Sequence, residues 1–341
     1  MLGRRWLFLT AYAVMIGAGA SVAVGDLEDS LSNFQACMMA GSESGTPTDS
    51  PVARIDPNTT NSPFAGVGSL KLVLSGGPTY LSSAVPILRR QILTTAHSLD
   101  VTNDGVIDFA PGNVTFYLNY GGDQTHAITA SMMLIHPSFT GFSSTTLTHD
   151  DIAVITLSQD LPLGVPIYSL YDGSLPLGET LTLVGYGHSG YGDVGFTTAA
   201  KLYTKRVGEN NADVFVGDDD GSLRDEIYLF DFDAPTVTDP LDVRNHWGGL
   251  SLGNTRETQL GFGDSGGPAF VLQGGAWRIA GINTFLAQFS GGPQPPLFET
   301  AGGGMLISGY RDWIVSVPAP GACVLGMIGF GMVGWLRRRF R

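Results

Sequence analysis

Short runs of β-forming residues recur between clusters of glycine, proline and aspartate from about residue 64 onward. The clearest runs are Leu70–Leu74, Val114–Leu118, Ile152–Leu157, Leu181–Val184, Ile227–Phe230 and Trp277–Ile282. Repeated short runs of this kind, bounded by turn residues, are typical of a β-sandwich or a pair of β-barrels. The one helical candidate is Tyr310–Val315, near the end. The body of the chain is therefore predicted to be all-β.

Composition excludes several other classes of protein. The chain holds 47 glycines and 19 prolines, too many for a helical bundle, and no collagen period accompanies them. Hydrophobic residues make up 43% and charged residues 14%, which favours a packed core over wholesale disorder. A net charge of −13 argues against nucleic acid as a partner. Cys37 and Cys323 are the two cysteines, so neither a disulfide framework nor a multi-cysteine metal cluster is expected.

The N-terminal end is typical of an export signal. Arg4 and Arg5 precede an apolar run, Trp6–Ile16, which is followed by Ala18-Gly19-Ala20. This order predicts a secretory signal peptide over residues 1–20; an N-terminal membrane anchor is the alternative, for which the run is short. Residues 21–54 are rich in Ser, Gly, Thr and Asp and are predicted to be a leader or propeptide of low order.

The C-terminal end, residues 318–341, is typical of a second targeting signal. Pro318-Ala319-Pro320 leads into an apolar stretch, Ala322–Leu336, and then into an arginine-rich tail. This arrangement resembles the PEP-CTERM sorting signal of Gram-negative bacteria, although it lacks that signal's Glu. The resemblance implies an exosortase-like processing partner and contact with the membrane through this segment; a plain stop-transfer anchor is the alternative. Both interpretations place the protein at the cell envelope or outside the cell.

Three segments carry the residues that acyl transfer needs. An apolar run leads to His97, Asp151 opens another, and Ser265 lies within Gly263-Asp264-Ser265-Gly266-Gly267-Pro268. A serine hydroxyl needs a base to take its proton as it attacks, and an acid must orient the imidazole. The backbone N–H groups of Gly263 and Ser265 are candidate donors to the oxyanion. These residues predict a nucleophilic serine, a general base and an orienting carboxylate.

With these motifs the chain resembles the chymotrypsin/trypsin-like serine proteases, whose triad has the same order along the chain. The resemblance implies two antiparallel six-stranded β-barrels over residues 55–317, with a boundary near residues 161–169 and a short closing helix. It places the acid directly before Ile-Ala, which selects Asp151 over its neighbour Asp150.

The function that follows is a secreted or envelope-associated serine endopeptidase, which hydrolyses proteins or peptides through an acyl-enzyme and requires no cofactor. Two alternatives are a catalytically inactive binding module on the same fold and an esterase with the same triad.

The sequence departs from the family in its disulfides and its activation site. Ser98 stands where a cysteine is expected beside the catalytic histidine, and Gly261 stands near another cysteine position. In the family, an amine freed by cleavage pairs with the acid before the nucleophile, which is Asp264 here. Arg54-Ile55 is the candidate cleavage site.

The resemblance also places the substrate pocket. Gln259 occupies the position that is an Asp in trypsin-like members, and Thr284-Phe285-Leu286 forms the strand that faces the substrate. Without an acid in the pocket, we expect only weak preference for Arg or Lys.

Two acidic loops are candidate calcium-binding sites. Oxygen-bearing residues recur before and after Gly105 in a pattern like the first half of an EF-hand loop, at Asp100, Thr102, Asp104 and Asp108, and a second acidic run spans 218–220. The closing Glu of an EF-hand loop is missing, since Pro111 falls there. Solvated acidic turns are the first interpretation, and a structural calcium ion is the alternative.

Overall fold

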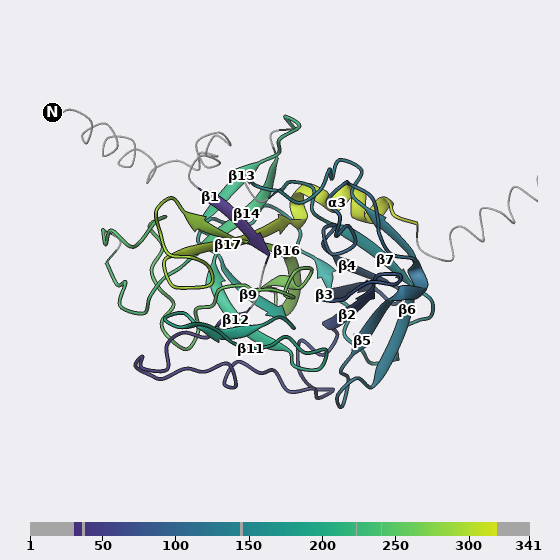
Figure 1. Ribbon diagram of the computed structural model, residues 1–341, viewed down its shortest axis with the longest axis horizontal. Helices are drawn as coiled ribbons and strands as arrows, with labels where there is room; N and C mark the ends of the chain where they lie inside the picture. The colour runs from purple at the N-terminus through teal and green to yellow at the C-terminus, as the bar shows by residue number, and fades with distance from the viewer. Residues whose placement is uncertain (1–30, 36–37, 144–145, 223, 240, 319–341) are drawn as a thin grey trace, which may run out of the picture.

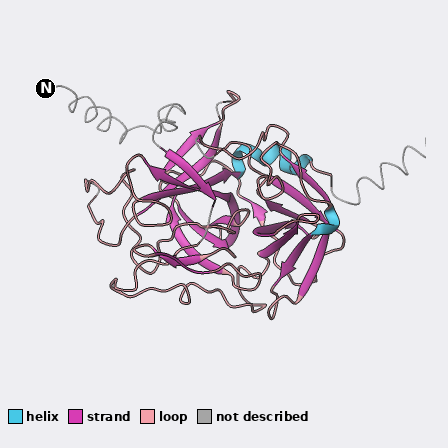
Figure 2. Cartoon of the chain, viewed as in Figure 1, coloured by secondary structure: helices cyan, strands magenta, loops and turns pink. Residues whose placement is uncertain are grey.

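The computed structural model describes residues 31–35, 38–143, 146–222, 224–239 and 241–318, with backbone alone for 31–35 (Figure 1). Most regular structure in this part is strand, as Figure 2 shows. The predicted signal peptide, and the predicted sorting signal beyond Pro318, lie outside the described residues. Among the described residues, no helix is long and apolar enough to cross a membrane.

The first half of the chain is a closed barrel in the order β2-β3-β4-β7-β6-β5. Alternation decides which side chains face inward: in β5, Val114, Phe116 and Leu118 are buried while the residues between them are half-buried. The elements are β2 (Gly68–Val73), β3 (Thr79–Leu88), β4 (Gln91–Thr94), the 3-10 turn η1 (Pro111–Asn113), β5 (Val114–Leu118), β6 (His126–Ile135) and β7 (Ala153–Leu157).

The second half is built on a nine-stranded sheet, with a separate two-stranded pair, β10 and β11. The main path is β12-β9-β15-β16-β17-β14-β13, and β1 and β8 also pair with β16. The elements are β1 (Leu31–Gln35), β8 (Ser169–Leu170), β9 (Thr180–Gly185), β10 (Ser189–Tyr191), β11 (Gly195–Thr198), β12 (Arg206–Asn211), β13 (Val214–Gly217), β14 (Asp225–Phe232), β15 (Pro268–Gln273), β16 (Ala276–Phe289), β17 (Thr300–Leu306) and the helix α3 (Ile307–Ser316).

The predicted all-β class, with a barrel and a closing helix, is confirmed. The second half has more strands in its sheet than the six of the expected barrel. The reason is the length of β16, whose 14 residues give room for β15, β17, β8 and β1 to pair along it.

A shared core joins the two halves. Leu93 and Val154 of the barrel belong to one buried cluster with Val184 and Ile282 of the second half and with Ile314 of α3. The chain crosses between the halves after Leu161, whose N–H donates to the Arg89 carbonyl at 2.7 Å, and β8 then pairs with β16. Loops that lie between the two halves are therefore held by contacts with both of them.

Residues 38–54 pack on the second half, although low order was expected for residues 21–54. Met38, Met39 and Ala40 are fully buried. Asp49 and Arg54, both buried, form an ion pair 2.6 Å long. The removal of this segment as a propeptide stays a prediction.

Candidate active site

The barrel places the candidate base, His97, and the candidate acid, Asp151, side by side. His97 follows β4, Asp151 precedes β7, and these two strands pair with Thr94 opposite Ala153. Ser265 comes from the second half, in the loop that leads into β15. The three residues therefore meet between the halves, although 168 positions separate the histidine from the serine.

The three side chains form a hydrogen-bonded line. Ser265 Oγ lies 3.0 Å from His97 Nε2, and His97 Nδ1 lies 2.6 Å from Asp151 Oδ2. The backbone N–H of His97 donates to Asp151 Oδ1 at 2.8 Å, so both carboxylate oxygens hold the histidine. All three residues are buried. When the ring proton of His97 is on Nδ1, the Nδ1–H group donates a hydrogen bond to the Asp151 carboxylate. Nε2 is then unprotonated, and its lone pair can accept the proton of the Ser265 hydroxyl.

Asp150, the rival to Asp151, is engaged elsewhere. Its backbone has a φ of +58°, in the left-handed region. Its Oδ1 lies 2.8 Å from His136 Nδ1, and its N–H donates to the Tyr310 hydroxyl at 2.9 Å. The carboxylate in contact with His97 is that of Asp151.

The nucleophile loop is anchored to the barrel. The Ser83 hydroxyl donates to the Gly263 carbonyl at 2.8 Å, and the Ser83 N–H donates to the Ser265 carbonyl at 2.8 Å. A side chain at Gly266 would place its Cβ 2.1 Å from Thr94 Oγ1, so glycine is required there. The N–H groups of Gly263 and Ser265 donate to no acceptor among the described residues. These two donors are free to bind a developing oxyanion.

Hydroxyl groups stand where the family resemblance leads one to expect a disulfide. Ser98 Oγ lies 2.7 Å from Ser82 Oγ and 2.6 Å from Thr95 Oγ1. The Ser82 hydroxyl also donates to the Ser265 carbonyl at 2.6 Å. Buried hydroxyls thus link the histidine turn to the nucleophile loop by hydrogen bonds.

Asp264 lies fully buried behind the nucleophile. Burial raises the pKa of its carboxyl to about 7, against the opposing effects of the Gly187 N–H and the charge of Arg206. The Gly187 N–H donates to its Oδ1 at 2.8 Å, and its Oδ2 has no hydrogen-bond partner among the described residues. The oxygens of Asp264 face the Gly187 turn and β9, since a Cβ at Gly185 would lie 2.0 Å from Oδ1.

Arg54, the residue before the candidate cleavage bond, is inaccessible in this structure. Besides its ion pair with Asp49, its guanidinium donates to the carbonyls of Arg256 at 2.7 Å and Glu257 at 2.8 Å. A protease could not take this side chain without local unfolding. Cleavage at this bond stays a prediction.

The residues predicted to form the substrate pocket lie close together but are covered. Gln259, Thr284 and Phe285 are fully buried, and Leu286 is 1% exposed. The open space beside Ser265 lies on another side of the nucleophile, in a cavity of about 640 Å³ that Leu72, Tyr80, His97, His188 and Phe262 help to line. Sequence reasoning missed His188 and Phe262 because neither belongs to a motif.

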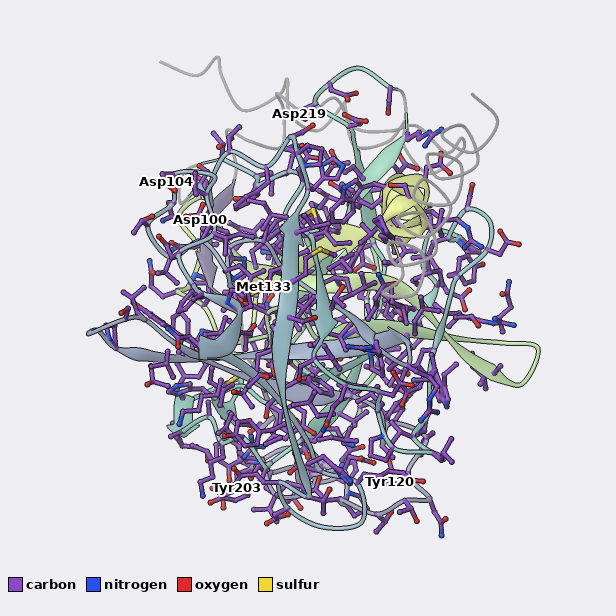
Figure 3. All side chains as sticks on the ribbon, turned by 90° about the vertical axis from the view of Figure 1, so that its right-hand side faces the viewer. Asp100, Asp104, Tyr120, Met133, Tyr203 and Asp219 are labelled. Atoms are coloured by element: carbon purple, nitrogen blue, oxygen red, sulfur yellow. The ribbon has the colours of Figure 1, made fainter. Side chains whose placement is uncertain are left out.

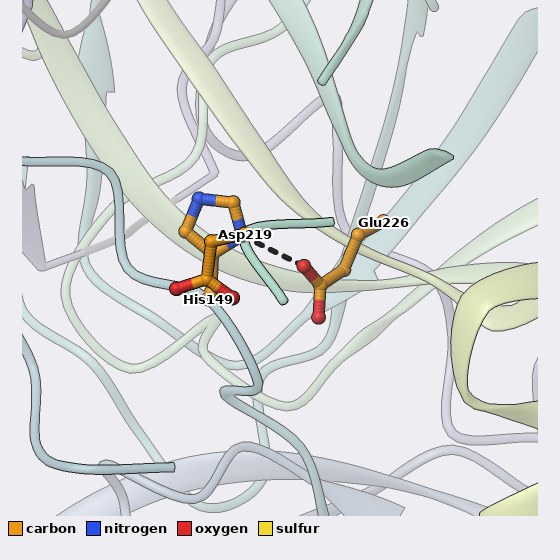
Figure 4. Close-up of side chains that lie close together, drawn as sticks. All are labelled: His149, Asp219 and Glu226. Carbon is orange, nitrogen blue, oxygen red and sulfur yellow. Dashed lines mark hydrogen bonds and ion pairs between the residues drawn. The ribbon is translucent and has the colours of Figure 1, made fainter. Parts of the chain in front are cut away.

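His149, Glu226 and Asp219 form a second histidine–carboxylate cluster (Figure 4). His149 Nδ1 lies 2.7 Å from Glu226 Oε2, and one ligand atom from each of His149, Glu226 and Asp219 lies within 4.8 Å of the others. Burial alone would lower the pKa of His149, but Glu226 and the nearby Asp219 and Asp150 raise it above its ordinary value. Among the described residues this is the one group of three or more such side chains whose spacing suits a metal ion.

In the predicted calcium loop, the carboxylates accept hydrogen bonds from backbone N–H groups of the loop itself. Asp100 Oδ2 accepts the Gly105 N–H at 2.8 Å, and Asp108 Oδ2 accepts the N–H groups of Val101 and Thr102 at 2.7 and 2.9 Å. Figure 3 shows Asp100 and Asp104 on this peripheral loop. Calcium binding here stays a prediction: if it occurs, a chelator lowers the melting temperature of the wild type and not that of Asp100→Asn.

No protein-family model matches the chain, and no curated protein matches it. Among solved structures, one described as HL collagenase at 1.7 Å resolution is similar to this chain at 18% identity and a TM-score of 0.48. The match covers 74% of this chain and 92% of the other.

Proposed function

We propose that the chain is a serine endopeptidase in which Ser265 is the nucleophile, His97 the general base and Asp151 the orienting carboxylate. The observation that carries the proposal is the continuous line from Ser265 Oγ through the His97 ring to Asp151, with contacts of 3.0 and 2.6 Å. Two free N–H donors lie in the same loop as the nucleophile. Base, acid and oxyanion donors together are what acyl transfer requires.

In the first step, Ser265 Oγ attacks the carbonyl carbon of a peptide bond while its proton moves to His97 Nε2. The imidazolium is stabilised by Asp151, and the oxyanion accepts hydrogen bonds from the N–H groups of Gly263 and Ser265. The C–N bond then breaks as Nε2 gives its proton to the leaving amine, which forms an acyl-enzyme. Water attacks the ester with His97 as the base again, and the acid product leaves with Ser265 restored.

The open cavity beside Ser265 supports access to the nucleophile. His97 and Ser265 are part of its wall, and Leu72 and Phe262 add apolar surface. A cavity with an apolar lining and a few convergent polar groups suits part of a peptide substrate. A small reagent can reach Oγ from this side.

A fluorophosphonate probe and a peptide library test the proposal. The wild-type protein should be labelled at Ser265 and should hydrolyse peptides, and Ser265→Ala should abolish both. Labelling without hydrolysis of any peptide, but with hydrolysis of esters, would favour the esterase. An absence of labelling in a folded protein would overturn the proposal and favour a binding module.

We further propose that the protein acts outside the cytoplasm or at the cell envelope of a bacterium, with an exosortase-like enzyme as the processing partner. The support is the sequence pattern of residues 1–20 and 318–341. Mass spectrometry of the mature protein would test this, because intact ends at both positions would contradict it.

A further inference from the structure

Strand β1 lies along an edge of β16 that leads to the nucleophile. The two strands are antiparallel, with Leu31 opposite Phe289 and Gln35 opposite Phe285. Two residues before Phe285, the Asn283 carbonyl accepts the Gly266 N–H at 2.9 Å. The β1 strand thus runs toward the residues that hold the nucleophile loop (Figure 1).

The chain beyond β1 fills the interior next to this edge. Met38 is fully buried in an apolar cluster that contains Phe230, Leu260 and Leu286. The Met39 N–H donates to the Gln259 carbonyl at 2.7 Å, and the Met39 carbonyl accepts from the Thr258 hydroxyl at 2.5 Å. The N-terminal segment therefore covers residues that were expected to line the substrate pocket.

The two sides of Ser265 differ in access. Toward β2 and β3, the cavity of about 640 Å³ opens on the nucleophile. Toward β16, the edge is paired with β1 and the space beyond it is filled by buried side chains. An extended peptide that adds to a sheet edge needs a free edge, and β1 already pairs with residues 285–289 of β16.

We propose that the segment formed by residues 31–35 and 38–40 acts as a built-in inhibitor: strand β1 occupies the peptide-binding edge of β16, and Met38 occupies the apolar site beside it. The inference rests on the proposed function, because it names what regulates the same site. When the segment leaves, the edge accepts an extended peptide, and the site vacated by Met38 accepts a long unbranched apolar side chain such as methionine. Apolar walls with no acid favour such a side chain over Arg or Lys.

The chain has a place where the segment could be released. Residues 43, 44 and 46–48 are exposed, and two buried residues, Gly41 and Ser42, separate them from the inhibitory segment. The buried pair of Asp49 and Arg54 lies beyond this loop and would remain attached to the body. A cut in the loop thus separates residues 31–42 from the rest of the protein without removing that anchor.

The experiment places a recognition sequence for a site-specific protease in loop 43–48 of the full chain. Fluorophosphonate labelling and hydrolysis of a short peptide amide with Met on the acyl side are measured before and after the cut. We expect similar labelling rates, because the cavity is already open, and a rise in peptide kcat/KM on the order of tenfold or more, because the competent state is no longer a minor fraction. The same insertion in the exposed turn at Gly274-Gly275 is the control and should give no rise.

A second variant covers the case in which the cut segment stays bound. Met38→Asp places a carboxylate in the apolar cluster, which should expel the segment and raise peptide kcat/KM without a cut. Val52→Asp, at a residue 74% exposed on the same stretch of chain, is the matched control and should change nothing. If both the cut form and Met38→Asp are labelled but keep the peptide kcat/KM of the intact protein, the proposal that this segment is an inhibitor is wrong. If no form is labelled, the proposed function itself fails.

Discussion

The two halves of the molecule differ in whether their sheets have unpaired strand edges. In the barrel, each of the six strands has a neighbour on both sides, and closure leaves no free edge. The sheet of the second half is open, and its long strand β16 takes β1 from far upstream. The barrel is therefore complete within residues 68–157, whereas the second half depends on a segment outside its own sequence. A closed half suits a rigid support, and an open half offers an edge that can be exchanged.

The halves also differ in their buried charge. Burial, reinforced by other acids nearby, raises the pKa of Asp233 to about 9, and burial raises the pKa of Glu257 to about 8. Burial likewise raises the pKa of Glu299 to about 7. All three lie in the second half. This half therefore carries the electrostatic cost of burying several acids close to one another.

The largest expected effect concerns the part of the proposed active site that lies in the barrel. Asp151→Asn should lower kcat by about 10⁴-fold, because the histidine loses the carboxylate that fixes its tautomer. Asp150→Asn is the matched control and should lose far less activity, since its side chain faces His136. Peptide hydrolysis by both variants, with melting temperatures to check folding, measures this. A greater loss of activity in Asp150→Asn than in Asp151→Asn would contradict the assignment of Asp151 as the orienting carboxylate.

The next effect concerns the second half's contribution, the nucleophile loop. Gly263 has a φ of +104°, and an added Cβ would lie 3.0 Å from Leu81 Cδ2 and 3.1 Å from Gly187 Cα. Gly263→Ala should therefore displace the oxyanion donor and lower kcat by roughly 10²–10³-fold. Gly221→Ala, at a φ of +85° with open space around it, provides the control for backbone strain alone. Equal kcat values for the two variants would contradict a role for the 263 N–H.

A smaller effect tests whether residues 49–54 belong structurally to the second half. Arg54→Gln would leave the buried Asp49 carboxylate without its cation, at a cost of about 3–5 kcal/mol in the free energy of unfolding. Arg224→Gln removes the cation of an exposed pair with Asp312 and should have little effect. Urea denaturation of both variants decides the matter. Similar small losses would show that the segment is only loosely attached.

The smallest effect is a pH dependence that comes from the second half. Native Asp233, Glu257 and Glu299 keep protons that the unfolded chain, with carboxyl pKa values near about 4, has already released. The native state therefore binds more protons, and stability falls as pH rises from about 5 to 9. Melting temperatures across this range should decline, and Asp233→Asn should flatten the decline. Asp242→Asn should not, because the hydrogen bond from Arg244 lowers the pKa of Asp242 to about 2, outside this range. A melting temperature that rises with pH would contradict these pKa directions.

Much of the fold could be predicted because its signals are local. The run Val114–Leu118 is strand β5 without change, and the helix expected over Tyr310–Val315 is the central part of α3. The triad candidates also came from local motifs, each marked by the small residues or strands around it. What a motif could not show was the pairing of β1 with β16, because strand addition depends on an edge formed by residues 250 positions away.

The sequence alone determined the all-β class and the three candidate catalytic residues, since alternation and motif chemistry are properties of neighbours along the chain, and the choice of Asp151 over Asp150 came from the resemblance to a family. Only the tertiary structure decided which face of Ser265 is open, that Arg54 is buried, and that Met38 fills the space beside the expected pocket. The physical reason is that burial is set by whatever packs on a surface. A segment of ordinary polar composition becomes part of the core when its few apolar residues find an uncovered site.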